Sequence, residues 1–183
     1  AELLLIRKES VDLRKKFSLK QNPVLGTSSA RRKAQMLAFR SDIELKDLRG
    51  NVPTRINKLR EGQYDAILLA AAGVERLEID LKEFYVERLG PKEFTPAPAQ
   101  GVLAIQIRKG EKELFDHLQK INDKTVQVTI GIERKVLNLF QGGCQMPVGA
   151  YAEYDDETEM YSVRVSKAAA WDTKPVSVYS ESK

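Results

Sequence analysis

The sequence of 183 residues is short of the residue types from which disulfides, metal centres and membrane spans are built. Its single cysteine, Cys144, cannot form a disulfide within the chain, so a reducing cytoplasm is the expected compartment. Its single histidine, His117, stands in a helical pattern without other metal-binding residue types nearby, which argues against a metal site. The apolar run at residues 3–6 is too short for a membrane span or the core of a signal peptide. These shortages indicate a soluble globular protein without a metal or a membrane partner.

Excess charge and aromatic residues are also scarce. The formal net charge is only +4, and aromatic residues make up 7% of the chain. The segment from Gly26 to Arg76 holds ten Lys and Arg against six Asp and Glu, an excess of four that equals the net charge of the whole chain. So small a net charge argues against binding of RNA or another long polyanion. The basic turns of this segment also lack aromatic residues on which bases could stack. The acidic turn at residues 155–158 argues the same for the C-terminal segment.

Strand and helix patterns alternate through the first hundred residues. The expected strands are residues 2–7, 23–25, 43–48 and 65–70, and the expected helices are residues 30–40, 53–61 and 71–77. Ser28 or Ser29 is expected to cap the first of these helices, and Pro53 suits the first turn of the second. The alternation predicts an α/β domain, with a mostly parallel sheet and helices on both of its faces.

The second half follows a different pattern. Residues 101–108 are almost continuously apolar, which is typical of a strand buried on both faces. Two helices are expected next, at residues 112–121 and 125–140, followed by strands at residues 148–153, 160–165 and 175–179. The sequence therefore predicts a small α+β C-terminal domain with an antiparallel sheet.

Unusual residues gather in three turns that follow strands of the expected α/β domain. They are Thr27, Ser28, Ser29, Arg31, Arg32, Arg49, Gly50, Asn51, Arg55, the run 70–73 and Arg76. Ligands of such sheets bind outside the carboxyl ends of the strands, and the N-termini of helices favour anions. Arginine adds bidentate recognition of carboxylate or phosphate. The turns predict an anion cleft, and the simpler alternative is a solvated basic face.

Cys144 lies in a glycine-rich loop, residues 141–151, between an expected helix and an expected strand. Two glycines precede the cysteine and allow backbone conformations that other residues rarely adopt, while Pro147 stiffens the entry to the strand. A buried, inert thiol is the simpler interpretation of a lone cysteine. A shaped loop that presents the thiol is the alternative.

Five motifs together resemble the porphobilinogen deaminase family, also called hydroxymethylbilane synthases. They are Leu-Gly-Thr-Ser-Ser-Ala-Arg-Arg at 25–32, Leu-Arg-Gly-Asn-Val-Pro-Thr-Arg at 48–55, Tyr-Asp-Ala-Ile-Leu-Leu-Ala at 64–70, Pro-Ala-Gln-Gly at 98–101 and Gly-Gly-Cys-Gln-Met-Pro-Val-Gly at 142–149. They occur in the family's order and cover essentially the whole chain. The resemblance implies a transferase of porphyrin and heme biosynthesis that condenses four porphobilinogen units into a linear tetrapyrrole with release of ammonia.

The resemblance also implies roles for individual residues. Cys144 matches the cysteine that holds a dipyrromethane cofactor through a thioether. Side-chain carboxylates of the cofactor are implied to bind Thr27, Ser28, Ser29, Arg31, Arg32, Arg49, Gly50 and Arg55, and those of the substrate to bind Arg31, Arg49, Arg55 and Arg76. The implied fold is periplasmic-binding-protein-like. The implied division is the family's second, anion-binding domain at 1–97, a hinge with a returning strand and helix of an otherwise missing first domain at 98–123, and a C-terminal domain that carries the cofactor cysteine at 124–183.

The sequence departs from the family at its N-terminus. Nothing in it matches the Lys-Asp motif that supplies the family's catalytic carboxylate, so the chain is expected to be a fragment that lacks most of the first domain and is inactive alone. Its C-terminus is also expected to lack the closing helix. The strand at 102–108 would then pair abnormally or lie exposed and favour self-association, whereas the full-length protein is expected to be a monomer. Two alternatives stay open: a non-catalytic carboxylate-binding module, and an RNA or phosphate binder.

Overall fold

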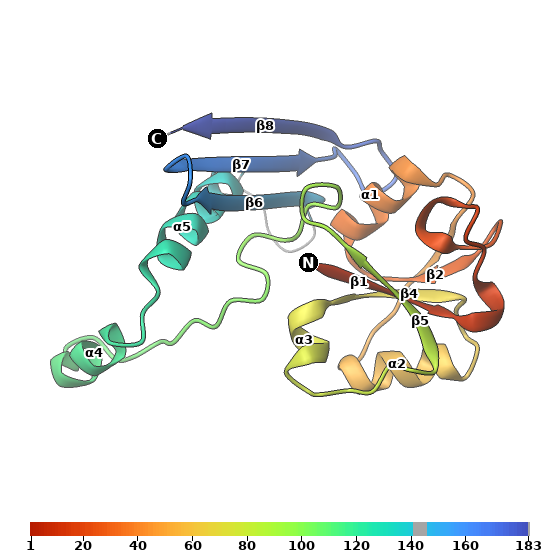
Figure 1. Ribbon diagram of the computed structural model, residues 1–183, viewed down its shortest axis with the longest axis horizontal. Coiled ribbons are helices and arrows are strands. Elements are labelled where there is room, and N and C mark those ends of the chain that lie inside the picture. Colours follow the sequence, from red (N-terminus) through yellow and green to blue (C-terminus); the bar gives the residue numbers. More distant parts are fainter. Residues whose placement is uncertain (141–145, 183) are drawn as a thin grey trace.

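The chain forms two separate sheets in the computed structural model, which describes residues 1–140 and 146–182 (Figure 1). The first sheet has the strand order β3-β2-β4-β1-β5. Its strands are β1 (Glu2–Arg7), β2 (Val24–Gly26), β3 (Glu44–Lys46), β4 (Ala66–Ala70) and β5 (Phe84–Leu89). The second sheet is antiparallel, with the order β6-β7-β8. Its strands are β6 (Val148–Asp155), β7 (Met160–Lys167) and β8 (Val176–Ser182).

Strand β1 runs against all the other strands of the first sheet. Strands β3, β2 and β4 are mutually parallel, and β1 pairs antiparallel with both β4 and β5. The expectation of a mixed α/β fold with a mostly parallel sheet is therefore confirmed, with β1 as the exception. In this register Glu2 pairs with Ala70 and Leu89, so the N-terminus of β1 lies beside the carboxyl ends of its neighbours.

Helices cover both faces of the first sheet, as predicted (Figure 1). Leu3 and Leu5 point to the face covered by α2 (Val52–Arg60) and α3 (Ala71–Glu75). Leu4 and Ile6 point to the opposite face, where α1 (Ala30–Phe39) packs. Two short 3-10 turns lie at Lys8–Ser10 and Lys16–Ser18, and Phe17 of the second is part of that core. Because β1 is apolar on both faces, it is buried along almost its whole length.

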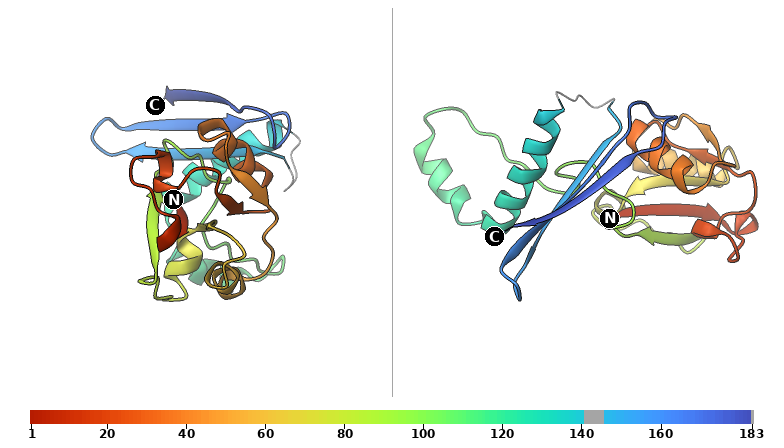
Figure 2. Two further views of the ribbon diagram at one scale, coloured as in Figure 1. Left: turned by 90° about the vertical axis from the view of Figure 1, so that its right-hand side faces the viewer. Right: turned by 90° about the horizontal axis from the view of Figure 1, so that it is seen from above.

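The segment that links the two sheets corrects one prediction. Residues 102–107 form no strand, and Leu103 and Ile105 are exposed, in place of the strand expected at 101–108. A strand that is apolar on both faces needs neighbours on both sides, and nothing in the described ranges 1–140 and 146–182 pairs with this one. Exposure was one of the two outcomes expected for it. Helix α4 (Lys112–Gln119) follows, has no buried residue and projects away from both sheets (Figure 2).

The C-terminal unit has the predicted order of helix and strands. Helix α5 (Lys124–Leu139) begins at Asp123, whose side chain accepts a hydrogen bond from the N–H of Val126, and it packs on β6 and β7. The turn at residues 155–158 joins β6 to β7, as expected. Strand β8 is exposed along its whole length. Apart from the strand at 101–108, the predicted elements match the observed ones within a few residues, but the sequence patterns did not reveal β5.

Residues 95–99 hold the C-terminal unit against the first sheet. The N–H of Ala150 donates to the carbonyl of Pro96 over 3.0 Å. The buried carboxylate of Glu133, in α5, accepts from the N–H groups of Ala99 (2.6 Å) and Ala152 (2.9 Å). Burial raises the pKa of Glu133, although both backbone donors oppose that shift. One carboxylate therefore joins the linking segment to β6.

Gly149 allows this close contact, and its substitution tests it. A Cβ at Gly149 would lie 2.8 Å from the carbonyl oxygen of Thr95, and backbone atoms cannot move aside as a flexible side chain can. We expect Gly149→Ala to lower the free energy of unfolding by about 1–3 kcal/mol. Gly131→Ala in α5 is the control: its Cβ would meet nothing within 4 Å, and stability should rise by about 0.5–1 kcal/mol. Urea denaturation followed by circular dichroism measures both variants, and an unchanged midpoint for Gly149→Ala would contradict the packing described.

Candidate functional site

A pocket of about 660 Å³ lies at the carboxyl end of β4, between the starts of α2 and α3. Its lining residues are Arg32, Gly50, Asn51, Val52, Pro53, Arg55, Leu69, Ala70, Gly73, Arg76 and Leu77. Three of them are arginines, and none is acidic. The pocket therefore joins an apolar floor to a positively charged rim.

The starts of α1 and α2 are shaped by their own side chains. Ser29 caps α1 by accepting the N–H of Arg32, which confirms one of the two predicted caps. Asn51 caps α2 by accepting both the N–H and the hydroxyl of Thr54, at 2.9 and 2.7 Å. Gly50 precedes that cap with φ of +121°, where a Cβ would lie 2.8 Å from the Thr54 side chain. A glycine is therefore needed for the tight turn into α2.

The hydroxyl groups of the first turn have partners within the protein. The Ser28 hydroxyl donates to the carbonyl of Leu48 and accepts from its N–H, both at 3.0 Å. Thr27 is buried, and its hydroxyl accepts the N–H of Ser29 at 3.3 Å. These side chains fix the β2–α1 turn against the β3–α2 turn.

Arg31 and Arg32 share one buried carboxylate. Arg31 donates to one carboxylate oxygen of Glu2 at 2.6 Å, and Arg32 donates to the other at 2.5 Å. Glu2 has 0% of its surface exposed, and the two arginines have 5% and 8%. The reversed direction of β1 is what brings Glu2 to this end of the sheet. The pair of arginines thus lies at the strand ends, as predicted, but with an acidic partner that the sequence analysis did not identify.

Arg31 and Arg32 each donate further hydrogen bonds, mainly to backbone carbonyl groups. Arg31 also donates to the carbonyl of Thr95 at 2.9 Å and to the side chain of Gln100 at 3.1 Å. Arg32 donates to the carbonyl of Leu68 at 3.2 Å, while its Nε atom is buried without a hydrogen-bond partner among the described residues. Because Arg32 also lines the pocket, it connects the buried cluster to the ligand-accessible space.

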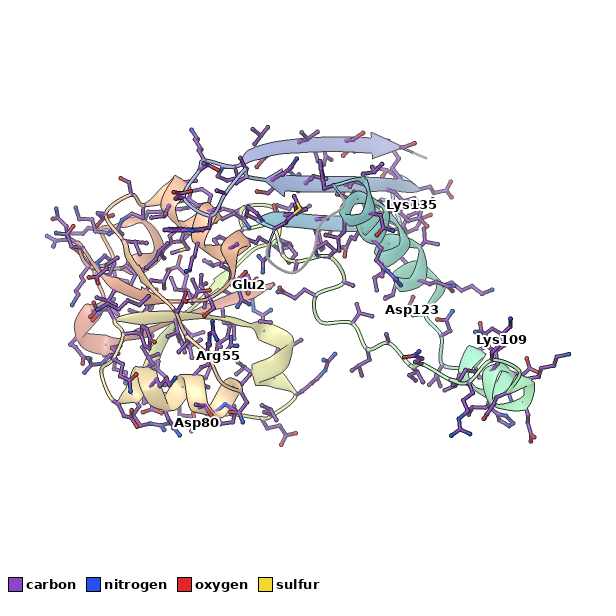
Figure 3. The ribbon with its side chains drawn as sticks, turned by 180° about the vertical axis from the view of Figure 1, so that it is seen from behind. Glu2, Arg55, Asp80, Lys109, Asp123 and Lys135 are labelled. Carbon is purple, nitrogen blue, oxygen red and sulfur yellow. The ribbon has the colours of Figure 1, made fainter. Side chains whose placement is uncertain are left out.

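Arg55 and Arg76 are held only by backbone carbonyl groups, which leaves their charges uncompensated. Arg55 donates from Nε to the carbonyl of Gly50 at 2.7 Å, and Arg76 donates to that of Gly101 at 2.5 Å. Arg49 is exposed on the turn before α2. Within the described ranges, none of the three forms an ion pair with a carboxylate. Figure 3 shows Arg55 and Glu2 in the body of the first unit, far from Lys109 on the arm before α4.

The charges of the cluster shift two pKa values. Burial alone would raise the pKa of Glu2, but the charges of Arg32 and Arg31 and their hydrogen bonds outweigh burial, so the pKa lies below its ordinary value. Partial burial lowers the pKa of Arg55, and the positive charge of Arg32 lowers it further. Arginine stays protonated at neutral pH despite such a shift.

Of the turn residues from which the cleft was predicted, the pocket brings together Arg32, Gly50, Asn51, Arg55, Ala70, Gly73 and Arg76. Thr27, Ser28, Ser29, Arg31 and Arg49 are not part of its lining, and Cys144 falls outside the described residues. The sequence analysis missed Glu2 and Gln100. A glutamate at the start of an apolar strand was the only signal for Glu2. The direction of that strand brings Glu2 to the arginines, and the sequence pattern does not reveal the direction.

No helix within residues 1–140 and 146–182 is long and apolar enough to cross a membrane. The same ranges contain no group of three or more potential metal-binding side chains.

The fold is a mixed α/β one, and its arginine-lined pocket lies at the carboxyl ends of the parallel strands, where ligands of such sheets bind. Residues 3–116 match the family model described as porphobilinogen deaminase, dipyromethane cofactor binding domain, and residues 127–168 match that described as porphobilinogen deaminase, C-terminal domain. The chain belongs to the porphobilinogen deaminase family, as its motifs predicted.

Curated relatives of the chain are named porphobilinogen deaminase. Those of Oceanobacillus iheyensis and Brevibacillus brevis are 45% and 43% identical over 139 and 143 residues. That of Halalkalibacterium halodurans is 46% identical over 137 residues. The alignments cover 76%, 78% and 75% of this chain, but only 45%, 45% and 44% of the relatives. The chain thus spans about half the length of the curated relatives it matches.

The lowered pKa of Glu2 predicts how stability depends on pH. Because the folded-state pKa lies below the ordinary value of 4.5, Glu2 stabilises the fold above that pH, and this stabilisation is lost as the pH falls through the folded-state pKa. We expect Glu2→Gln, which removes one partner of a buried ion pair, to lower the free energy of unfolding at pH 7 by about 3–5 kcal/mol. The difference between wild type and variant should shrink below pH 4.5. Urea denaturation between pH 3 and pH 7 tests this, and a difference independent of pH would contradict it.

Proposed function

We propose that the chain contributes the cofactor-binding and C-terminal domains of a porphobilinogen deaminase, or hydroxymethylbilane synthase. The enzyme is a cytoplasmic transferase that joins four porphobilinogen molecules and releases ammonia. The observation that supports this most directly is the pocket, where Arg55 and Arg76 keep uncompensated charges at the carboxyl end of the sheet. The domain at 1–97, the second of the family, is periplasmic-binding-protein-like, and the division at 1–97, 98–123 and 124–183 is part of the proposal.

The arginines bind the acetate and propionate groups of pyrroles. Each pyrrole brings two carboxylates, so a growing chain of pyrroles requires several fixed positive charges. Arg32, Arg55 and Arg76 supply these in the lining of the pocket, and Arg49 supplies a further one from the exposed turn before α2. Guanidinium groups suit the task because they stay charged when water is excluded and match carboxylates with two parallel hydrogen bonds.

Dipyrromethane fits this pocket in its chemistry. Its carboxylates match the arginine rim, and its two apolar rings match the floor formed by Leu69, Ala70 and Leu77. When bound, the group supplies the pyrrole end that receives incoming porphobilinogen units. Cys144 holds it through a thioether, which keeps the reacting groups at a high effective concentration. Thr27, Ser28, Ser29 and Gly50 shape the turns that present the arginines.

The chemistry also needs a carboxylate that stabilises positive charge at the pyrrole nitrogen and manages protons. Glu2 is not available for this because both its oxygens are paired with arginines. Asp65 lies at the amino end of β4, bonded to Ser10 and Lys20, and Glu75 pairs with Arg88. None of these three carboxylates lines the pocket, and the proposal therefore takes the acid–base group from the part of the enzyme that this chain does not match.

The turnover of porphobilinogen tests the function. We expect no tetrapyrrole from the 183-residue chain alone, since loss of an electrostatic catalytic group typically costs a factor of about 10²–10³ in rate. Addition of the part of the Oceanobacillus iheyensis relative that this chain does not match should restore tetrapyrrole formation. Intact mass should then show a dipyrromethane adduct that Cys144→Ser abolishes. Activity of the chain alone would refute the missing carboxylate, and a restored enzyme indifferent to Cys144→Ser would refute the attachment site.

Two arginines of α2 allow a test of whether binding depends on the pocket or only on the net charge of the protein. Arg55 lines the pocket, whereas Arg60, at the other end of the same helix, pairs with Glu83 on the surface. We expect Arg55→Gln to weaken porphobilinogen binding about tenfold, because one charged hydrogen-bond partner of a carboxylate is lost. Arg60→Gln removes the same charge and should leave binding within about twofold. Isothermal titration calorimetry of both variants measures this, and equal losses would indicate a nonspecific effect of charge.

A further inference from the structure

Glu2 presents to Arg31 and Arg32 the same group that a pyrrole side chain would present. It is a carboxylate with each oxygen bound by a different guanidinium, at 2.6 and 2.5 Å. A ligand carboxylate bound between two arginines would make the same two contacts. The fold therefore supplies from β1 what the ligand would otherwise bring.

Burial fixes the position of the Glu2 carboxylate between the two arginines. Glu2 is fully buried, its neighbours along β1 are core residues, and β4 and β5 flank it on both sides. A side chain fixed in this way competes with any ligand at its own position, because no diffusion or ordering of the carboxylate is required. Two positive charges and one negative charge leave this cluster with a net charge of +1.

We infer that Glu2 determines the specificity of the anion site by filling the carboxylate position between Arg31 and Arg32 from within. Ligand carboxylates then bind at Arg55 and Arg76 in the pocket and at Arg49 on the exposed turn before α2, and Arg32 is the member of the cluster that also lines the pocket. Glu2 limits how many carboxylates a ligand can place in the site, and it holds the two arginines aligned while no ligand is bound. This inference rests on the proposed function only in naming the ligand as a polycarboxylate.

Removal of the internal carboxylate should strengthen anion binding. Glu2→Gln keeps the shape of the side chain and removes its charge, so the cluster gains one unit of positive charge beside the pocket. We expect the Kd for citrate, measured by isothermal titration calorimetry at low ionic strength and pH 7, to fall about tenfold. Glu44→Gln is the matched control: it changes the net charge equally, but at an exposed position on the amino end of β3. The control should stay within about twofold of wild type.

A second variant covers the case in which Glu2→Gln does not fold. Glu2→Ala leaves a space between the two arginines that matches a small carboxylate, so acetate should restore what the mutation removes. We expect acetate to raise the Tm of Glu2→Ala by about 3 °C more than that of wild type. Leu5→Ala, a core variant of the same strand, should show no such specific gain.

These experiments measure citrate and acetate, and neither requires turnover of porphobilinogen. An unchanged citrate Kd in a folded Glu2→Gln protein, or a Glu2→Ala protein that acetate does not stabilise beyond wild type, would overturn the inference about Glu2. Failure of tetrapyrrole formation in the complemented enzyme would refute the proposed function and leave these results standing. The two hypotheses are therefore separable.

Discussion

A buried cluster of two arginines and one glutamate sets the charge beside the arginine-lined pocket. Arg31 and Arg32 could not lie within the fold unpaired, because an uncompensated buried charge is strongly unfavourable. Glu2 solves this problem only because β1 runs against β4, which places its first side chain at the carboxyl end of the sheet. One choice of strand direction thus fixes both the stability of the arginines and the charge that the site presents.

The same cluster joins the site to the rest of the chain. Arg31 binds the carbonyl of Thr95, and the side chain of Gln35 accepts the N–H of Thr95 and donates to its carbonyl. Four residues further on, Glu133 of α5 binds the N–H of Ala99. The linking segment is therefore held from the site on one side and from the C-terminal unit on the other. A change in the charge of the cluster would act on the position of this segment through hydrogen bonds, without any need for a long chain of contacts.

Sequence patterns predicted most elements because local chemistry defines them. Ser29 signals the start of α1 directly, and the apolar run of β1 signals a buried strand. The prediction of a strand at 101–108 was wrong because a segment that is apolar on both faces forms a strand only where neighbouring strands exist. The presence of such neighbours cannot be read from the segment itself. The site was predicted only in part, because some of its residues depend on their surroundings and not on local sequence. The strand-end rule finds arginines such as Arg32 and Arg55, but it cannot find a partner like Glu2, whose position depends on the direction of its strand.

The arginines differ in whether they have an acidic partner, and this difference separates those that stabilise the surface from those proposed to bind a ligand. Arg60 pairs with Glu83, and Arg88 pairs with Glu75, so these surface charges are largely compensated where they lie. Arg55 and Arg76 are instead oriented by backbone carbonyls, which accept a hydrogen bond but leave the positive charge in place. A protein that merely needed solubility would gain nothing by aligning uncompensated guanidinium groups around an apolar floor. The arrangement suits the proposed ligand, which combines carboxylates with flat rings, better than a phosphate backbone, which offers no apolar surface to the pocket.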